Sequence, residues 1–147
     1  MPMKLNCSGC SRRALLQGLG LAALSACAGT PSQPSGTAAT CGANLCLDLN
    51  DPANKDLTSA GGALIVDSST DTIMVVRVSE TQVAALSAIC THASCETTYT
   101  PSTMQLDCPC HGSQFSLSGA VVRGPARRSL RTYTATLSGT TITITLA

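Results

Sequence analysis

The chain has 147 residues, a length that favours one main domain. Apolar residues make up 44% and charged residues 12%, which excludes a disordered and highly charged chain. The formal net charge is +1, Trp is absent and aromatic residues make up 2%, so the basic and stacking groups of a nucleic-acid-binding surface are missing. The nine cysteines point instead to disulfides, to metal, or to both.

Residues 1–26 are expected to be an export signal rather than part of the fold. Positive residues come first, and the apolar stretch 14–26 that follows is shorter than the ~20 residues needed to span a bilayer. The sequence around Arg12 and Arg13 resembles a bacterial twin-arginine signal, and LSAC, ending at Cys27, resembles a lipobox. The resemblance implies cleavage before Cys27 and a lipid on its sulfur. An uncleaved anchor helix, or a cleaved signal with an incidental cysteine, is the alternative.

A flexible linker is expected over residues 27–40, followed by one domain over residues 41–147. The linker carries no charge and consists mainly of Ala, Gly, Pro, Ser and Thr. Export as a lipoprotein would place this domain in the bacterial cell envelope, on the periplasmic side and tethered to a membrane. Without the signal the chain keeps six basic and eight acidic residues, a net charge of −2.

The rest of the chain reads as short strands separated by turn residues, so the fold class is all-β. In the last part, every second residue of 133–137 and 142–146 is apolar and Ser138-Gly139 provides a turn, which predicts a hairpin with one buried face. No stretch predicts a long amphipathic helix. The expected strands are Gly62–Asp67, Thr72–Val78, Gln82–Ile89, Thr103–Asp107, Thr132–Ser138 and Thr141–Leu146.

Two short motifs contain both histidines of the chain. The first motif, 90–95, has the pattern C-x-H-x2-C, and the second, 108–111, has the pattern C-x-C-H. If two cysteines and both histidines bind metal, one cysteine of each motif remains for a disulfide, which an exported compartment permits. A zinc site with the same ligands is one alternative, and three disulfides among the six cysteines after Cys27 are another. One Cys and one His from each loop suit a binuclear iron site with thiolates on one iron and imidazoles on the other.

With these motifs, residues 60–147 closely resemble a Rieske [2Fe–2S] domain of the disulfide-containing type. The resemblance implies an antiparallel β-sandwich with a small cluster-binding subdomain of two loops, and one [2Fe–2S] cluster per chain. Its implied cluster ligands are Cys90, His92, Cys108 and His111. Its implied disulfide between the loops joins Cys95 and Cys110.

Three further residues match the surroundings of the cluster in this family. The resemblance makes Ser113 a hydroxyl donor to a bridging sulfide and places Pro125 in a proline loop that covers the cluster. Phe115 stands where high-potential relatives have a Tyr, whose hydroxyl reaches a ligand sulfur. Because Phe lacks a donor, we expect a reduction potential in the middle of the Rieske range. Arg127 and Arg128, which follow the proline loop, place positive charge near the cluster end.

The function expected from the resemblance is one-electron transfer. Cys41 and Cys46, outside the two motifs, are expected to close a small disulfide loop at the start of the domain. The partner would be another redox protein, a cytochrome or an oxidoreductase subunit, with quinol as a further candidate. Alternatively, the chain is the Rieske subunit of a quinol-oxidising cytochrome bc-type complex, or of a molybdenum oxidoreductase such as arsenite oxidase. A non-redox lipoprotein with zinc at the site is the third hypothesis.

Overall fold

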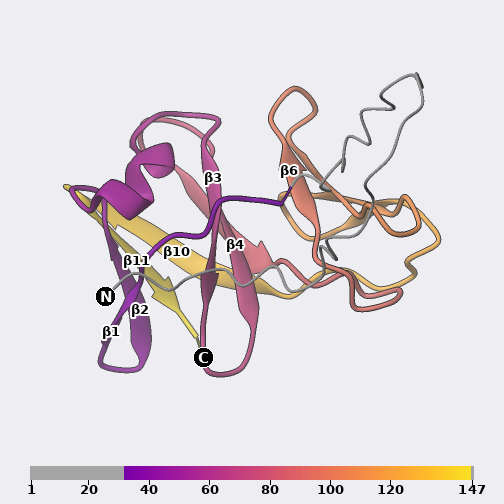
Figure 1. Ribbon diagram of the computed structural model, residues 1–147, viewed down its shortest axis with the longest axis horizontal. Coiled ribbons are helices and arrows are strands. Elements are labelled where there is room, and N and C mark those ends of the chain that lie inside the picture. Colours follow the sequence, from indigo (N-terminus) through magenta and orange to yellow (C-terminus); the bar gives the residue numbers. More distant parts are fainter. Residues whose placement is uncertain (1–31, 147) are drawn as a thin grey trace, which may run out of the picture.

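The computed structural model describes residues 32–146, and the expected export signal and Cys27 lie outside them. The described residues form eleven strands and one short 3₁₀ helix, η1 (Pro52–Thr58). The strands are β1 (Ala39–Cys41), β2 (Asn44–Asp48), β3 (Ala63–Asp67), β4 (Thr72–Arg77), β5 (Val83–Ser87), β6 (Thr98–Thr100), β7 (Gln105–Asp107), β8 (Gln114–Ser116), β9 (Val121–Arg123), β10 (Thr132–Ser138) and β11 (Thr141–Thr145). They form two antiparallel sheets, as Figure 1 shows, and the all-β prediction is confirmed.

The larger sheet has the strand order β1-β2-β11-β10-β5-β4-β3. The predicted terminal hairpin is present, because β10 and β11 pair from Ser138 and Thr141 outward, and the apolar side chains of β11 are buried. β10 joins the two halves of the sheet through only two residue pairs with β5. The sheet can therefore bend at β10, so that β2 and β11 cover one face of β3, β4 and β5.

The strands β3, β4 and β5 form a middle layer that is buried on both faces. Leu64 and Ile73 point into a core shared with β2 and β11. Their neighbours Ile65 and Met74 point the other way, into a second core shared with residues of 88–130. Burial on both faces explains why β3 and β4 read as continuous apolar runs rather than as alternating ones.

The smaller sheet, β6-β7-β8-β9, belongs to a subdomain formed by residues 88–131, between β5 and β10. Figure 1 shows this small subdomain at one end of the molecule, beyond the larger sheet. The small subdomain contributes Tyr99, Leu106 and Phe115 to the second core. The two cysteine- and histidine-containing motifs are the loops β5–β6 and β7–β8 of this subdomain. The expected sandwich with a small two-loop subdomain is thus confirmed.

Part of the segment predicted as a flexible linker is structured. The Gly36 N–H donates to the Ile65 carbonyl, and the Ile65 N–H donates to the Pro34 carbonyl, at 2.8 and 2.9 Å. The buried Asn54 side chain accepts from the Thr37 N–H and donates to the Thr37 carbonyl. The two backbone bonds pair Ile65 at the outer edge of β3, and Asn54 holds Thr37, so the chain from Pro34 onward belongs to the domain.

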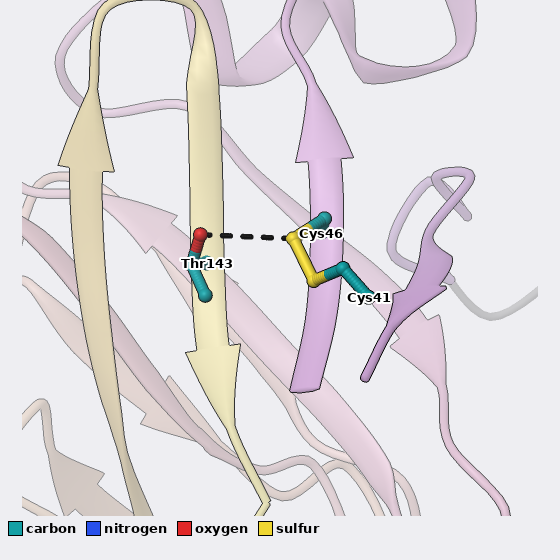
Figure 2. The surroundings of a disulfide bond; sticks show 3 residues. All are labelled: Cys41, Cys46 and Thr143. Carbon is teal, nitrogen blue, oxygen red and sulfur yellow. Dashed lines mark hydrogen bonds between the residues drawn. A yellow bond between two sulfur atoms is a disulfide. The ribbon is translucent and has the colours of Figure 1, made fainter. Parts of the chain in front are cut away.

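Cys41 and Cys46 form the expected small disulfide, and it fastens the hairpin of β1 and β2. Figure 2 shows Cys46 beside Thr143 of β11, with 3.7 Å between Sγ and Oγ1. The disulfide therefore lies at the far end of the larger sheet from the small subdomain. Within residues 32–146, no helix has the length and apolar character needed to cross a bilayer.

Candidate metal centre

The two loops have the same backbone hydrogen-bond pattern. In the first loop, the Cys90 N–H donates to the Cys95 carbonyl and the Ser94 N–H donates to the Cys90 carbonyl. In the second, the Cys108 N–H donates to the Ser113 carbonyl and the Gly112 N–H donates to the Cys108 carbonyl. Both loops need a left-handed residue four positions after their first cysteine, with φ of 54° at Ser94 and 73° at Gly112. Each loop is thus a closed backbone unit that fixes its first cysteine.

A disulfide between Cys95 and Cys110 joins the tips of the two loops, with the pairing expected from the sequence. Its two sulfurs and the Cys108 Sγ lie within 4.8 Å of one another. Because disulfide sulfurs have no thiolate to offer, only Cys108 of this group is available to bind metal. The disulfide contributes rigidity, since it holds one loop against the other.

Cys90 and Cys108 are the free cysteines of residues 32–146, and both are buried. They are 1% and 2% exposed, and both line the core between the middle layer and the small subdomain. Burial, together with a hydrogen bond to Cys90, raises the pKa of the Cys108 thiol above its usual value. Two adjacent buried thiols are costly to ionise unless a cationic group compensates them, as a bound metal does.

His92 and His111 lie side by side at the surface. Both residues are exposed, and their ring centroids are 4.9 Å apart with an interplanar angle of 87°. The structure therefore pairs the two free thiols in the interior and the two imidazoles at the surface. An imidazole there can bind metal through one ring nitrogen and leave the other for solvent or a partner.

A third loop, residues 124–128, closes over the two metal-site loops. The Ala126 N–H donates to the Ser113 Oγ at 3.0 Å, and the Thr91 hydroxyl donates to the Arg128 carbonyl at 2.6 Å. The Gly124–Pro125 peptide bond in this loop is cis. Sequence reasoning missed Thr91 and Ala126. Their hydrogen bonds join partners that are 37 and 13 positions apart in the chain, so no local sequence pattern indicates them.

The residues present fit a binuclear iron–sulfur group. Ser113 is 0% exposed, and its oxygen accepts from Ala126, yet its own proton has no acceptor within residues 32–146. A buried hydroxyl proton without a partner is costly, and a sulfide beside it would accept that bond. Phe115 is also 0% exposed and contributes only apolar contacts to the core that contains Cys90 and Cys108. Two thiols, two imidazoles and one buried hydroxyl are donors that such a group can use.

Comparison with known proteins identifies the family. The Rieske [2Fe-2S] domain matches residues 50–134. The cytochrome b6-f complex iron-sulfur subunit of Synechococcus sp. (strain JA-3-3Ab) is 46% identical over 54 residues, which are 37% of this chain and 31% of the relative. The subunit of the same description from Thermosynechococcus vestitus is 41% identical over 70 residues, 46% of this chain and 39% of the relative. The chain thus matches about a third of the length of these curated relatives.

Solved structures agree with this assignment. The cyanobacterial plasma membrane Rieske protein PetC3 from Synechocystis PCC 6803 superposes with a TM-score of 0.54 at 30% identity, covering 66% of this chain and 93% of that protein. The ferredoxin of carbazole 1,9a-dioxygenase from Nocardioides aromaticivorans IC177 has a TM-score of 0.52 at 28% identity, covering 58% and 86%. With its fold, its loops and its sequence in agreement, this chain belongs to the Rieske [2Fe–2S] domain family, whose cofactor is a [2Fe–2S] cluster.

Proposed function

We propose that this protein transfers single electrons through a [2Fe–2S] cluster held by Cys90, His92, Cys108 and His111. When bound, the cluster takes up and releases one electron at a time. The observation that carries the proposal is how the donors are divided: two free thiols are buried, and two exposed imidazoles lie together at the surface. The thiols would hold the inner iron away from water, and the imidazoles would hold the outer iron at the surface that a partner meets.

The ligand set determines how readily an electron is accepted. Two thiolates and two neutral imidazoles supply two negative charges, where four cysteines would supply four, so adding an electron costs less electrostatic energy. Rieske sites accordingly span roughly −150 to +300 mV, against about −400 mV for plant-type ferredoxins. Ser113 supplies one hydrogen-bond donor to this site and Phe115 supplies none, which favours a midpoint within that range rather than at its top.

The remaining residues of the site keep the donors in place. The Cys95–Cys110 disulfide joins the two loops, so His92 and His111 are held as a pair. The third loop is fixed to one loop through Ser113 and to the other through Thr91. A rigid site changes little in shape between its two oxidation states, which lowers the reorganisation that each electron transfer requires.

We further propose that residues 1–26 direct export and that a lipid on Cys27 tethers the domain to a membrane in the cell envelope. The arginine pair and the lipobox-like LSAC support this proposal. The structured chain begins to pack on β3 at Pro34, so the tether would be the short segment between Cys27 and Pro34. If the lipid is present, Cys27→Ala will move the protein from the membrane fraction to the soluble fraction, and labelled palmitate will no longer be incorporated.

A second candidate function is that of a subunit in a quinol-oxidising complex. The curated relatives described as cytochrome b6-f complex iron-sulfur subunits favour it. Gentle extraction of the membrane fraction separates the two hypotheses. A cytochrome b that co-purifies with this chain would establish the subunit, whereas a chain that migrates alone would support a free carrier.

Metal analysis and electron paramagnetic resonance test the main proposal. The purified protein should contain two irons and two acid-labile sulfides per chain, and after reduction it should give a rhombic signal typical of a mixed Cys and His ligand set. Cys90→Ser should abolish the signal. Cys41→Ser, which breaks the disulfide at the far end of the larger sheet, should keep it. Zinc in place of iron, or equal loss in both variants, would refute the ligand assignment.

A further inference from the structure

Charge is distributed unevenly between the two parts of the molecule. The small subdomain, residues 88–131, has four basic and two acidic residues, a net charge of +2 with histidines neutral. The rest of the described chain has two basic and six acidic residues, a net charge of −4. The basic residues of the small subdomain are Arg123, Arg127, Arg128 and Arg131. The small subdomain is therefore positive, whereas the described residues as a whole are negative. Of its four arginines, Arg131 stacks on Tyr133 of β10.

Two of these arginines are held in a fixed place beside the metal-site loops. Arg127 and Arg128 are exposed, and they follow directly after Ala126, whose N–H bonds to Ser113. The Arg128 carbonyl accepts the Thr91 hydroxyl, next to the ligand positions. Neither guanidinium lies within 4.0 Å of a carboxylate of residues 32–146, so the described chain does not neutralise them.

The same arginines border a hollow at His92. A cavity of about 360 Å³ is lined by Thr91, His92, Pro125, Arg127 and Arg128, and we call these five residues the His92 rim. The exposed large apolar side chains of the described chain are Met104 and Val122, and neither belongs to the rim. Whatever approaches His92 therefore meets the two arginines of the rim, together with the exposed Pro125.

We propose that the His92 rim docks a redox protein whose own electron-entry site is surrounded by Asp and Glu carboxylates. The proposal rests on the proposed function, because it takes His92 as the route by which an electron leaves. A partner that covers this imidazole must accept or supply an electron, which a lipid surface cannot do. Complementary charge would orient the encounter, since the negative end of this molecule turns away from an acidic partner and the rim turns toward it.

The opposite signs of the local and total charge allow a decisive measurement. The described chain has a net charge of −2, which by itself repels an anion. The rim attracts one, but only within about a Debye length, roughly 10 Å at 0.1 M ionic strength. Ferricyanide is a suitable anionic probe, because it takes one electron from the reduced protein and becomes ferrocyanide, with no proton or third reactant.

The experiment follows the oxidation of dithionite-reduced protein by ferricyanide in a stopped-flow instrument at increasing ionic strength. We expect the rate to fall by roughly tenfold between 10 mM and 0.5 M salt, at the low end of the 10- to 1,000-fold range of electrostatic steering. The double variant Arg127→Gln/Arg128→Gln should be oxidised more slowly at low salt, and its rate should no longer decrease as the salt concentration rises. A rate that rises with salt in the unaltered protein would show that the total charge dominates and would overturn the proposal.

Lys55 provides a matched control, because it is an exposed cation of the other subdomain, in η1. Lys55→Gln removes the same charge as Arg128→Gln but leaves the rim intact. We expect Lys55→Gln to keep the salt dependence and Arg128→Gln to reduce it. Equal effects of the two substitutions would mean that only total charge matters, and the rim would have no special role.

Binding of a labelled polyglutamate peptide, measured by fluorescence anisotropy, tests the same surface without electron transfer. Arg127→Gln/Arg128→Gln should weaken this binding several-fold, and Lys55→Gln should not. Vesicles containing phosphatidylglycerol test the competing occupant: arginine-dependent sedimentation without an effect on ferricyanide oxidation would assign the rim to a membrane and overturn the proposal. A protein without a reducible cluster would refute the proposed function instead, and the absence of its paramagnetic signal would show this separately.

Discussion

Replacing Phe115 with tyrosine should raise the midpoint reduction potential of the site. Phe115 is 0% exposed and packs in the same core as Cys90 and Cys108, the candidate thiolate ligands. A tyrosine hydroxyl placed there has no water to bond with, so a ligand sulfur is its natural acceptor. The reduced site carries one more negative charge than the oxidised site, and it therefore gains more from this bond.

The size of the shift follows from the strength of such a bond. A hydrogen bond to a charged group contributes about 1.5–3 kcal/mol, and only the part that grows on reduction changes the potential. If about half of it grows, the gain is about 0.75–1.5 kcal/mol. For a one-electron couple a tenfold change in the equilibrium constant corresponds to about 59 mV, so the expected rise is roughly 30–65 mV. Fitting the extra oxygen into a full core should also cost about 1–3 kcal/mol of the free energy of unfolding.

A redox titration followed by electron paramagnetic resonance measures the shift, and urea unfolding measures the cost in stability. Phe115→Leu is the control, because it changes the packing without adding a donor. A tyrosine variant whose midpoint is unchanged or lower, although its spectrum is intact, would show that this ring does not face a ligand sulfur. An equal rise in Phe115→Leu would assign the effect to packing rather than to the hydroxyl.

Three other substitutions test the metal-site loops and the contact between β10 and Asp71. Breaking the Cys95–Cys110 disulfide with Cys95→Ala should lower the free energy of unfolding by about 3 kcal/mol, as expected for a loop closed over 15 residues, and should speed iron loss during incubation with a chelator. Ser94→Gly should raise the free energy of unfolding in urea by up to ~1 kcal/mol, because Ser94 has a φ of 54°; a lower value would contradict this. The Tyr133 hydroxyl donates to Asp71 at 2.6 Å, and burial, this bond and the Asp71 charge raise the pKa of Tyr133 to about 12. The contribution of the protonated Tyr133 hydroxyl to stability is therefore complete below pH 10 and is lost as the pH rises from 10 to 12. The variant Tyr133→Phe should be less stable by about 1–2 kcal/mol at pH 7, and its stability should not show this part of the pH dependence.

Of the six strands with five or more residues, the sequence predicted all but β2, and it predicted the short strands poorly. The expected strands 62–67, 72–78 and 82–89 match β3, β4 and β5, because their β-branched and apolar runs are bounded by turn residues. The expected strand 103–107 begins only at Gln105, since the chain turns at residues 101–104. The three-residue strands β1, β6, β8 and β9 are too short to show a period of two, and they exist because neighbours in the sheet supply their partners.

At the site, the sequence predicted the disulfide between the two loops but not the hydrogen bonds that hold the third loop against them. The two motifs contained every predicted ligand, because cysteine and histidine at such spacing serve few other purposes. The two bonds that fix the third loop, from Thr91 and to Ser113, depend on where the chain returns after β9. The packing of residues 34–37 on β3 was missed for a similar reason: a segment rich in Gly, Pro, Ser and Thr carries no pattern that shows which sheet edge it will meet.

The layer of β3, β4 and β5, enclosed on both sides, makes the two parts of this molecule depend on each other for folding. Opening either half would bare one face of the same strands, with Ile65 and Met74 on one side and Leu64 and Ile73 on the other. The molecule should therefore unfold as one cooperative unit, and the amides of this layer should be the slowest to exchange with deuterium. A destabilising substitution at any of these four side chains, far from the metal site, would therefore also weaken the binding of the cofactor.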